Sequence, residues 1–84
     1  MSNVIIYTTR VCPYCVRAKT LLNNKGVSYS EIDVSDDPEL RMNMVQKAGG
    51  KRTVPQIFIG DHHVGGSDDL HKLEQEGKLD ALLA

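Results

Sequence analysis

The spacing of apolar residues along this chain changes several times, and each change marks the boundary of a secondary-structure element. Residues 3–8 form a continuous apolar and β-branched run, which predicts a buried strand. Over residues 13–24 the apolar positions recur at helical spacing, with Pro13 suited to a first turn and Gly26 to the exit, so we predict a helix. A second strand is expected over residues 27–34.

The alternation within this second strand is imperfect. Val27 and Tyr29 share one parity, whereas Ile32 and Val34 share the other, so a regular strand directs the two pairs to opposite faces. Either a bulge or a change of the apolar face accounts for this pattern.

A helix and a hairpin are predicted next. Asp37 is a candidate N-cap with Pro38 at the first helical position, and Gly49-Gly50 ends the helix. Between them lies an apolar stripe of Leu40, Met44, Val45 and Ala48. Two short strands over residues 55–59 and 62–64, joined by a Gly-Asp turn, then read as a hairpin.

The chain should close with a helix and a leucine-rich tail. We expect Ser67 to cap this helix and Gly77 to end it, and we expect the leucines at 79, 82 and 83 to pin the tail. The predicted order is therefore β-α-β-α-β-β-α. Its first unit has the length of a parallel strand pair with a crossover helix, so we expect a small mixed sheet flanked by helices, of the α/β class.

Composition and charge narrow the function. A chain of 84 residues is predicted to be one domain spanning residues 1–84. Its 40% apolar and 25% charged residues are typical of a globular protein, and its net charge of −1 leaves little field for nucleic acid or an anionic membrane. The N-terminus lacks the features of a secretory signal, and two cysteines are too few for a disulfide-stapled secreted domain. We therefore expect a cytoplasmic protein, and a monomer.

Both cysteines lie in one motif, Cys12-Pro13-Tyr14-Cys15, at a strand-to-helix junction. Residues three apart are neighbours once a helix begins, so the two sulfurs can approach each other. Unpaired N–H groups and the helix macrodipole favour a thiolate at Cys12, as do the nearby cations Arg10, Arg17 and Lys19. We therefore predict that Cys12 is a nucleophile and that Cys15, one turn into the helix, is a more buried resolving thiol.

A structural zinc site is the main alternative for such a motif. The chain has no second C-x-x-C, and the remaining soft ligands are His62, His63 and His71. We expect the first two to be exposed hairpin residues and the third to lie on a helix surface, none of them catalytic. No metal site is predicted. A C-x-x-C that opens the helix of a β-α-β unit instead indicates a thioredoxin-like redox site.

Three blocks of sequence together resemble the dithiol glutaredoxins, in particular the small bacterial ones. They are Cys12-Pro13-Tyr14-Cys15, Thr53-Val54-Pro55 and Gly65-Gly66-Ser67-Asp68-Asp69, and the resemblance extends over the whole chain. It implies a thioredoxin fold, glutathione as electron donor and co-substrate, no permanently bound cofactor, and reduction of protein–glutathione mixed disulfides.

The resemblance also implies where glutathione binds. A cis Val54-Pro55 bond would leave the Val54 backbone free to pair with the cysteinyl part of the ligand, although Pro55 could instead simply begin an edge strand. Thr53 belongs to the same block. The helix start at Gly66 and Ser67 suits the γ-glutamyl carboxylate, and Asp68 suits its ammonium group. An ordinary helix cap is compatible with the same residues.

The glycine carboxylate of glutathione needs a cation as its partner. The family usually has a lysine three residues before the first cysteine, where this chain has Thr9, so Arg10 and Arg52 are the candidates. The alternative for Arg10 is a solvated surface charge. Tyr14 either packs on the ligand, shields Cys15 or belongs to the apolar face of its helix.

Two other functions remain open at this stage. A thioredoxin-like protein reduced by a flavoenzyme would differ in its reductant. An iron–sulfur carrier would share a cluster between two subunits through Cys12 and two glutathiones. Pro13 and Tyr14 disfavour the carrier, because cluster-binding relatives generally have smaller, single-cysteine motifs. Expected partners are glutathione and glutathionylated or disulfide-containing proteins, with ribonucleotide reductase as one candidate.

Overall fold

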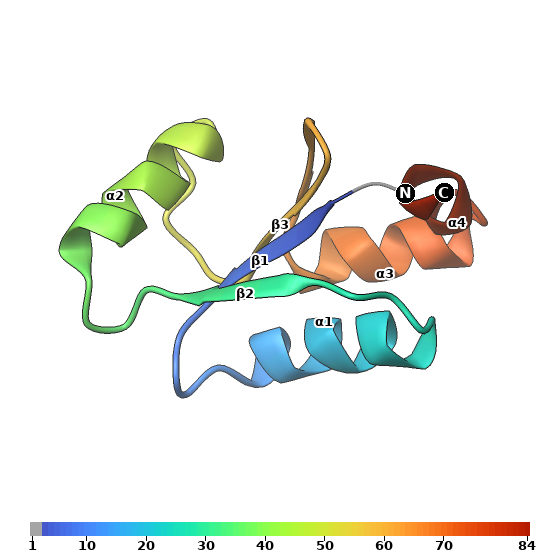
Figure 1. Ribbon diagram of the computed structural model, residues 1–84, viewed down its shortest axis with the longest axis horizontal. Helices are drawn as coiled ribbons and strands as arrows, with labels where there is room; N and C mark the ends of the chain where they lie inside the picture. The colour runs from blue at the N-terminus through green and yellow to red at the C-terminus, as the bar shows by residue number, and fades with distance from the viewer. Residues whose placement is uncertain (1–2) are drawn as a thin grey trace.

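The computed structural model describes residues 3–84, in which helices cover both faces of one four-stranded sheet (Figure 1). In chain order the elements are β1 (Val4–Thr8), α1 (Pro13–Asn24), β2 (Ser30–Asp33), α2 (Pro38–Lys47), β3 (Gln56–Ile59), β4 (His62–Gly65), α3 (Ser67–Gln75) and α4 (Leu79–Leu83). The predicted mixed sheet flanked by helices is confirmed, with one short helix added at the end.

The sheet has the order β2-β1-β3-β4, so the first strand lies inside it. β1 pairs with β2 in parallel, as the β-α-β length predicted, and β3 pairs antiparallel with both β1 and β4. A central strand is buried on both faces, which explains the continuous apolar run of β1. Because β3 runs antiparallel to β1, the loop after β1 and the loop before β3 lie at the same end of the sheet.

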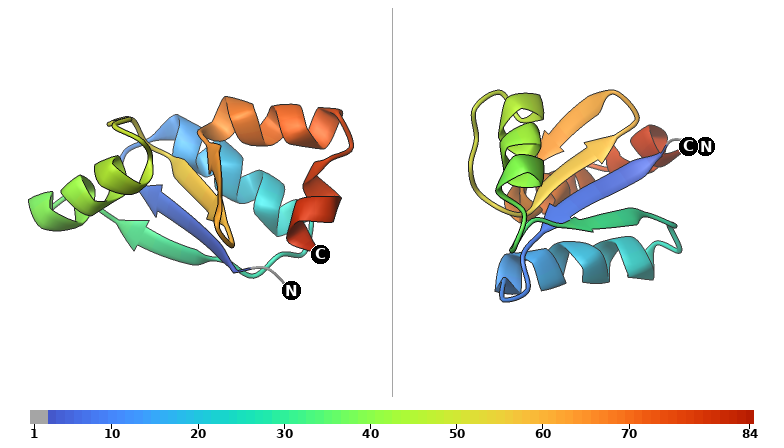
Figure 2. Two further views of the ribbon diagram at one scale, coloured as in Figure 1. Left: turned by 90° about the horizontal axis from the view of Figure 1, so that it is seen from above. Right: turned by 60° about the vertical axis from the view of Figure 1, so that its left-hand side comes forward.

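The core has two parts, one on each face of the sheet. The larger part lies under α1, α3 and α4, and consists of Val4, Ile6, Ala18, Leu22, Ile57, Ile59, Leu70 and Leu79. The smaller part lies under α2 and is built around Tyr7, Val34 and Met44. Figure 2 shows α1 and α2 on opposite sides of the strands.

Strand β2 covers Ser30–Asp33, so it is shorter than the strand predicted over residues 27–34, and residues 27–29 precede it. Val27 and Tyr29 pack on the larger core, whereas Ile32 and Val34 pack on the smaller one. Glu31, which has the parity of the first pair, reaches Lys19 of α1. The strand therefore keeps a regular alternation, and the side of the segment that is apolar changes along it.

Most helix ends follow the predicted residues, and the start of α3 differs. Asp37 caps α2 by accepting the Leu40 N–H at 3.0 Å, and Gly26 follows α1 with a positive φ of 69°. The N-cap of α3 is Gly66, not Ser67, which is the first residue inside the helix. The expected strand start at Pro55 is also one residue early, since β3 begins at Gln56.

The leucine-rich tail forms α4, which the sequence reading did not predict as a helix. Leu79 is fully buried in the larger core, so this helix closes the end of the sheet near the start of β1 (Figure 2). Within residues 3–84, no helix is both long and apolar enough to cross a membrane.

Candidate active site

Cys12 lies in the turn between β1 and α1 and is itself the N-cap of the helix. Its sulfur accepts a hydrogen bond from the Cys15 backbone N–H at 3.2 Å, the role that an oxygen side chain usually has at this position. Its carbonyl accepts from the Val16 N–H at 3.1 Å. The first turn of α1 thus offers a sulfur anion both a hydrogen bond and the positive end of the helix macrodipole.

Cys15 is far more enclosed, with only 1% of its surface exposed. Burial raises the pKa of its thiol to about 12, and the hydrogen bond with Cys12 acts in the same direction. The Thr9 backbone and the Lys19 charge lower that pKa, but by less. At neutral pH Cys15 is therefore a thiol, while Cys12 is partly exposed to solvent.

The segment before β3 faces Cys12. The Val54–Pro55 peptide bond is cis, as the resemblance implied, and the Cys12 thiol donates to the Val54 carbonyl at 3.8 Å. Within residues 3–84 the Val54 N–H has no hydrogen-bond partner. A backbone donor and acceptor are thus side by side beside the sulfur.

An open groove of about 530 Å³ runs from this segment to the start of α3. It brings together every predicted glutathione-binding residue except Arg10 and Arg52. Its lining consists of Tyr14, Lys51, Thr53, Val54, Pro55, Gln56, Gly66, Ser67, Asp68 and Asp69. Tyr14 is 55% exposed, so its ring forms a wall of the groove and not part of the core.

The two arginines lie outside this groove. Arg10 forms an exposed ion pair with Asp36, with 2.9 Å between Nη2 and Oδ1. Arg52 lines a separate hollow against α2, and its carbonyl accepts from the Arg41 guanidinium at 3.0 Å. The cation that does line the groove is Lys51, next to Arg52 in the chain.

At the far end of the groove, the start of α3 is held by its own side chains. The Gly66 N–H donates to the Asp69 carboxylate at 3.0 Å. Ser67 is only 3% exposed, and its hydroxyl lies 3.4 Å from Nδ1 of His71. Asp68 is exposed and lines the groove.

Sequence reasoning missed a buried hydrogen-bond chain that supports the Thr53-Val54-Pro55 segment. Gln56, 1% exposed, donates from its amide to the Thr53 carbonyl at 2.9 Å and accepts from Nε2 of His63 at 2.7 Å. His63 also stacks on Phe58, so the expectation that it is an exposed hairpin residue is wrong, whereas His62 is exposed. Burial, and then the Lys51 charge, lower the pKa of His63 below its ordinary value. The sequence signal for Gln56 is a polar residue at the start of an otherwise apolar strand.

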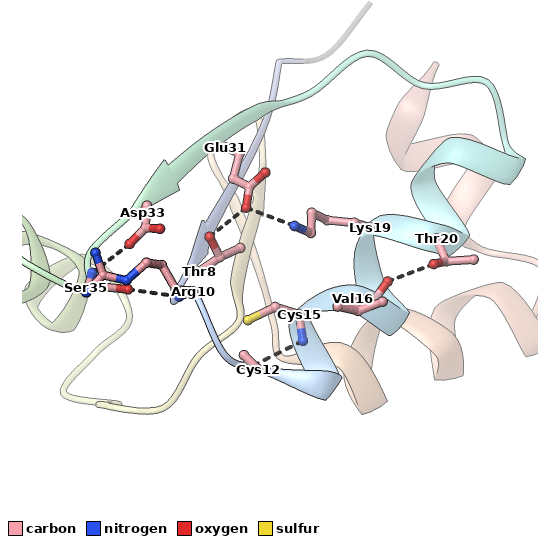
Figure 3. A network of polar contacts seen from close by, with 10 residues as sticks. All are labelled: Thr8, Arg10, Cys12, Cys15, Val16, Lys19, Thr20, Glu31, Asp33 and Ser35. Carbon is pink, nitrogen blue, oxygen red and sulfur yellow. Dashed lines mark hydrogen bonds and ion pairs between the residues drawn. The ribbon is translucent and has the colours of Figure 1, made fainter.

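Behind Cys15 lies a second polar cluster, formed by Thr8, Lys19 and Glu31 (Figure 3). The hydrogen bond from Thr8 and the ion pair with Lys19 hold the pKa of Glu31 below its usual range. Among residues 3–84, no group of three or more His, Cys, Asp or Glu side chains is arranged to hold a metal ion.

Two thiols of unequal exposure at a helix N-terminus, facing a cis-proline segment, define a thiol–disulfide oxidoreductase. The glutaredoxin family model matches residues 4–64, and the chain belongs to the glutaredoxin family, whose members are glutathione-dependent thiol–disulfide oxidoreductases.

Individual relatives agree with this assignment. The chain is 61% identical to a glutaredoxin of Pseudomonas aeruginosa over 84 residues, covering all of this chain and 99% of the relative. The solution structure of a Brucella melitensis glutaredoxin is similar, with 60% identity, a TM-score of 0.87, and 99% and 89% of the two chains covered. A buckwheat glutaredoxin described as a glutathione complex has 30% identity and a TM-score of 0.88, covering 98% of this chain and 76% of that one. The expected thioredoxin fold is therefore confirmed.

Proposed function

We propose that glutathione binds in the groove between Tyr14 and Asp69, with its sulfur at Cys12. The observation that carries this proposal is the Val54 N–H, which has no hydrogen-bond partner among residues 3–84, beside the Val54 carbonyl next to the Cys12 sulfur. An extended peptide pairs with such a backbone edge as an added strand does. The buckwheat relative described as a glutathione complex supports the same ligand class.

The γ-glutamyl end of glutathione would then reach the start of α3. Its carboxylate suits the N–H groups that follow Gly66, together with the Ser67 hydroxyl, since a helix N-terminus favours an anion. Its ammonium suits the exposed carboxylate of Asp68. Thr53, Pro55 and Tyr14 form the walls between the two ends.

For the glycine carboxylate we propose Lys51 in preference to the sequence-derived candidates Arg10 and Arg52. Lys51 lines the groove, whereas Arg10 is engaged with Asp36 and Arg52 lines the hollow at α2. A charged group already at the groove needs no rearrangement to meet the ligand.

The two cysteines would act in different steps of the reaction. In the first step the Cys12 thiolate attacks a protein–glutathione mixed disulfide, forms the Cys12–glutathione disulfide and releases the protein thiol. A second glutathione then attacks the glutathione sulfur of this intermediate, which forms glutathione disulfide and releases the Cys12 thiolate. With a protein disulfide as substrate, Cys12 first forms a mixed disulfide with the protein and releases one protein thiol. Cys15 then attacks Cys12, which forms the Cys12–Cys15 bond and releases the reduced protein, and glutathione reduces that bond.

Replacing each cysteine in turn tests this division. Cys12→Ser should abolish reduction of every disulfide. Cys15→Ser should keep much of its activity on a small glutathione mixed disulfide, because free glutathione completes that cycle. On an intramolecular protein disulfide it should lose most activity, since the internal thiol has a high effective concentration that free glutathione lacks. Glutathione-coupled turnover of both substrates measures the two arms.

Two results would contradict the proposal. Activity retained by Cys12→Ser would move the nucleophile elsewhere. Equal losses on both substrates for Cys15→Ser would mean that Cys15 also serves the first step, by positioning or activating Cys12.

The setting we propose follows from the chemistry. Glutathione acts as co-substrate, and no permanently bound cofactor takes part in either half of the reaction. A monomer working in the cytoplasm, where the glutathione pool is kept reduced, suits a reductase of protein disulfides. Ribonucleotide reductase and glutathionylated proteins are the substrates we propose.

A further inference from the structure

We propose that Lys19 is a positioning residue for the dithiol half of the reaction, its ammonium stabilising the negative charge that develops on Cys15 as that thiol attacks the Cys12 mixed disulfide. This inference rests on the proposed function and concerns only its second step. Lys19 lies one helical turn after Cys15, on the same side of α1, and Figure 3 shows both side chains extending from α1 toward the sheet.

The ammonium of Lys19 is held in place from the sheet. It lies 3.0 Å from Oε2 of Glu31 on β2, and its side chain is 28% exposed. The same carboxylate oxygen accepts from the hydroxyl of Thr8 at 2.8 Å, and Thr8 is fully buried on β1. Two strands therefore fix a cation that would otherwise move freely on the surface of α1.

The groups around Cys15 act on it in opposite directions. Burial and Cys12 disfavour its thiolate, whereas the Thr9 backbone and Lys19 favour it. Lys19 in turn faces Glu31, Tyr29 and Cys15, and the ion pair with Glu31 keeps it protonated, with its pKa raised above the ordinary value. Asp33 is the other charged group that acts on Glu31.

This balance changes when Cys12 enters a mixed disulfide. The sulfur of Cys12 is then uncharged, so its unfavourable effect on a Cys15 anion is removed, while Lys19 stays in place. The Cys15 thiol loses its proton, its sulfur bonds to Cys12, and the disulfide to the substrate breaks. The departing thiolate takes up a proton, so the step converts one thiol and one disulfide into another such pair with no external oxidant or reductant.

The size of the effect follows from two opposing dependences. Raising the pKa of a thiol by one unit lowers its thiolate fraction about tenfold at a pH below that pKa. The remaining thiolate is more nucleophilic, by about threefold for a Brønsted coefficient of roughly 0.4–0.5. Loss of the Lys19 charge should therefore slow attack by Cys15 about threefold for each unit by which the pKa rises.

A single-turnover experiment isolates this step. Reduced protein is mixed with excess glutathione disulfide, which forms the Cys12–glutathione disulfide, and its conversion to the Cys12–Cys15 disulfide is followed by rapid alkylation and mass spectrometry. We expect Lys19→Gln and Lys19→Met to slow this conversion by up to about threefold between pH 6 and 8, in a profile parallel to wild type. Lys19→Arg, which keeps the charge, should restore the rate.

Lys25→Gln is the matched control. Lys25 ends α1, and its ammonium is paired with Glu74 and Asp80 at 2.8 Å each, far along the helix from the cysteines. The Lys25→Gln variant loses the same charge and comparable ion pairs. A rate that is unchanged in Lys25→Gln and lowered in Lys19→Gln therefore locates the effect at Cys15. In a Cys15→Ser background, reduction of a small glutathione mixed disulfide measures what Lys19→Gln does to Cys12 alone, and the loss of rate there should be smaller than the loss in the conversion to the Cys12–Cys15 disulfide.

The inference is overturned if Lys19→Gln and Lys19→Met convert the intermediate at the rate of Lys25→Gln. It is also overturned if Lys19→Arg is as slow as Lys19→Gln, because the side chain would then act through packing and not charge. A failure of the proposed function looks different, since no Cys12–glutathione disulfide would form in the wild type.

Discussion

At the scale of single residues, the two thiols show how position alone separates the roles of identical side chains. Cys12 caps α1 and is partly exposed, whereas Cys15 lies three residues on and is 1% exposed. Burial raises the pKa of Cys15 to about 12, against the opposing effects of Thr9 and Lys19, so it is held as a thiol until an intermediate forms beside it. A resolving thiol in this state does not compete with Cys12 for incoming disulfides.

Replacing the neighbouring cations Lys51 and Arg52 tests which of them contacts the glycine carboxylate of glutathione. Lys51→Gln should raise the apparent KM for glutathione roughly three- to tenfold, since a charge-assisted contact contributes about 0.7–1.4 kcal/mol when partly exposed. Arg52→Gln and Arg10→Gln remove the same charge outside the groove, and we expect them to stay near wild type. Steady-state kinetics with glutathione as the varied substrate measure all three. A raised KM in Arg52→Gln alone would transfer the glycine carboxylate to the α2 side.

Elements with strong local signals were the ones that could be predicted from the sequence. The N-cap at Asp37 and the glycine after α1 depend on nearest neighbours in the chain, so the residues themselves specify them. Strand β2 was predicted too long, because the apolar residues before it pack on the core without pairing. Lys51 and His63 were missed because their surroundings depend on which distant segments the sheet brings together.

The turn before α3 leaves no room for a side chain at Gly65. Gly65 has a φ of +113°, and a Cβ there would lie 2.3 Å from Oδ2 of Asp69, the atom that accepts the Gly66 N–H. Gly65→Ala should therefore cost at least about 2 kcal/mol of unfolding free energy, from a lost cap and a strained backbone. It should also raise the KM for glutathione, because the γ-glutamyl end is expected to meet this turn.

Gly60→Ala is the control for that substitution. Gly60 has a comparable left-handed φ of 58°, but the space around its Cβ position is open and it lies in the hairpin turn away from the groove. It should lose stability through strain alone, with the KM for glutathione unchanged. Urea unfolding and glutathione kinetics on both variants separate the two effects. Equal KM values would mean that the turn before α3 takes no part in binding.

At the scale of the whole molecule, the sheet assembles the site from segments far apart in the chain. Because β3 pairs beside β1, the turn after β1 that carries Cys12 meets the segment before β3 that carries Val54. The link from β4 to α3 then adds Gly66 to the same groove. Periodicity predicted the elements but not this juxtaposition, which only the resemblance across three separate blocks indicated.

The last helix shows how the remainder of the chain supports that arrangement. Leu79 is fully buried in the larger core together with Ile6, Leu22 and Leu70, so α4 is a structural part of the domain. Leu79→Ala should destabilise the protein by about 2–4 kcal/mol, through lost burial and the cavity left behind. For a domain of this size that corresponds to a fall in Tm of roughly 10–25 °C.

Leu82→Ala, at a half-buried position of the same helix, should have a clearly smaller effect. Both variants should keep wild-type turnover well below their midpoints, because α4 does not line the groove. Thermal unfolding followed by circular dichroism measures the difference, and an unchanged midpoint for Leu79→Ala would show that the sheet and the first three helices hold the core without α4.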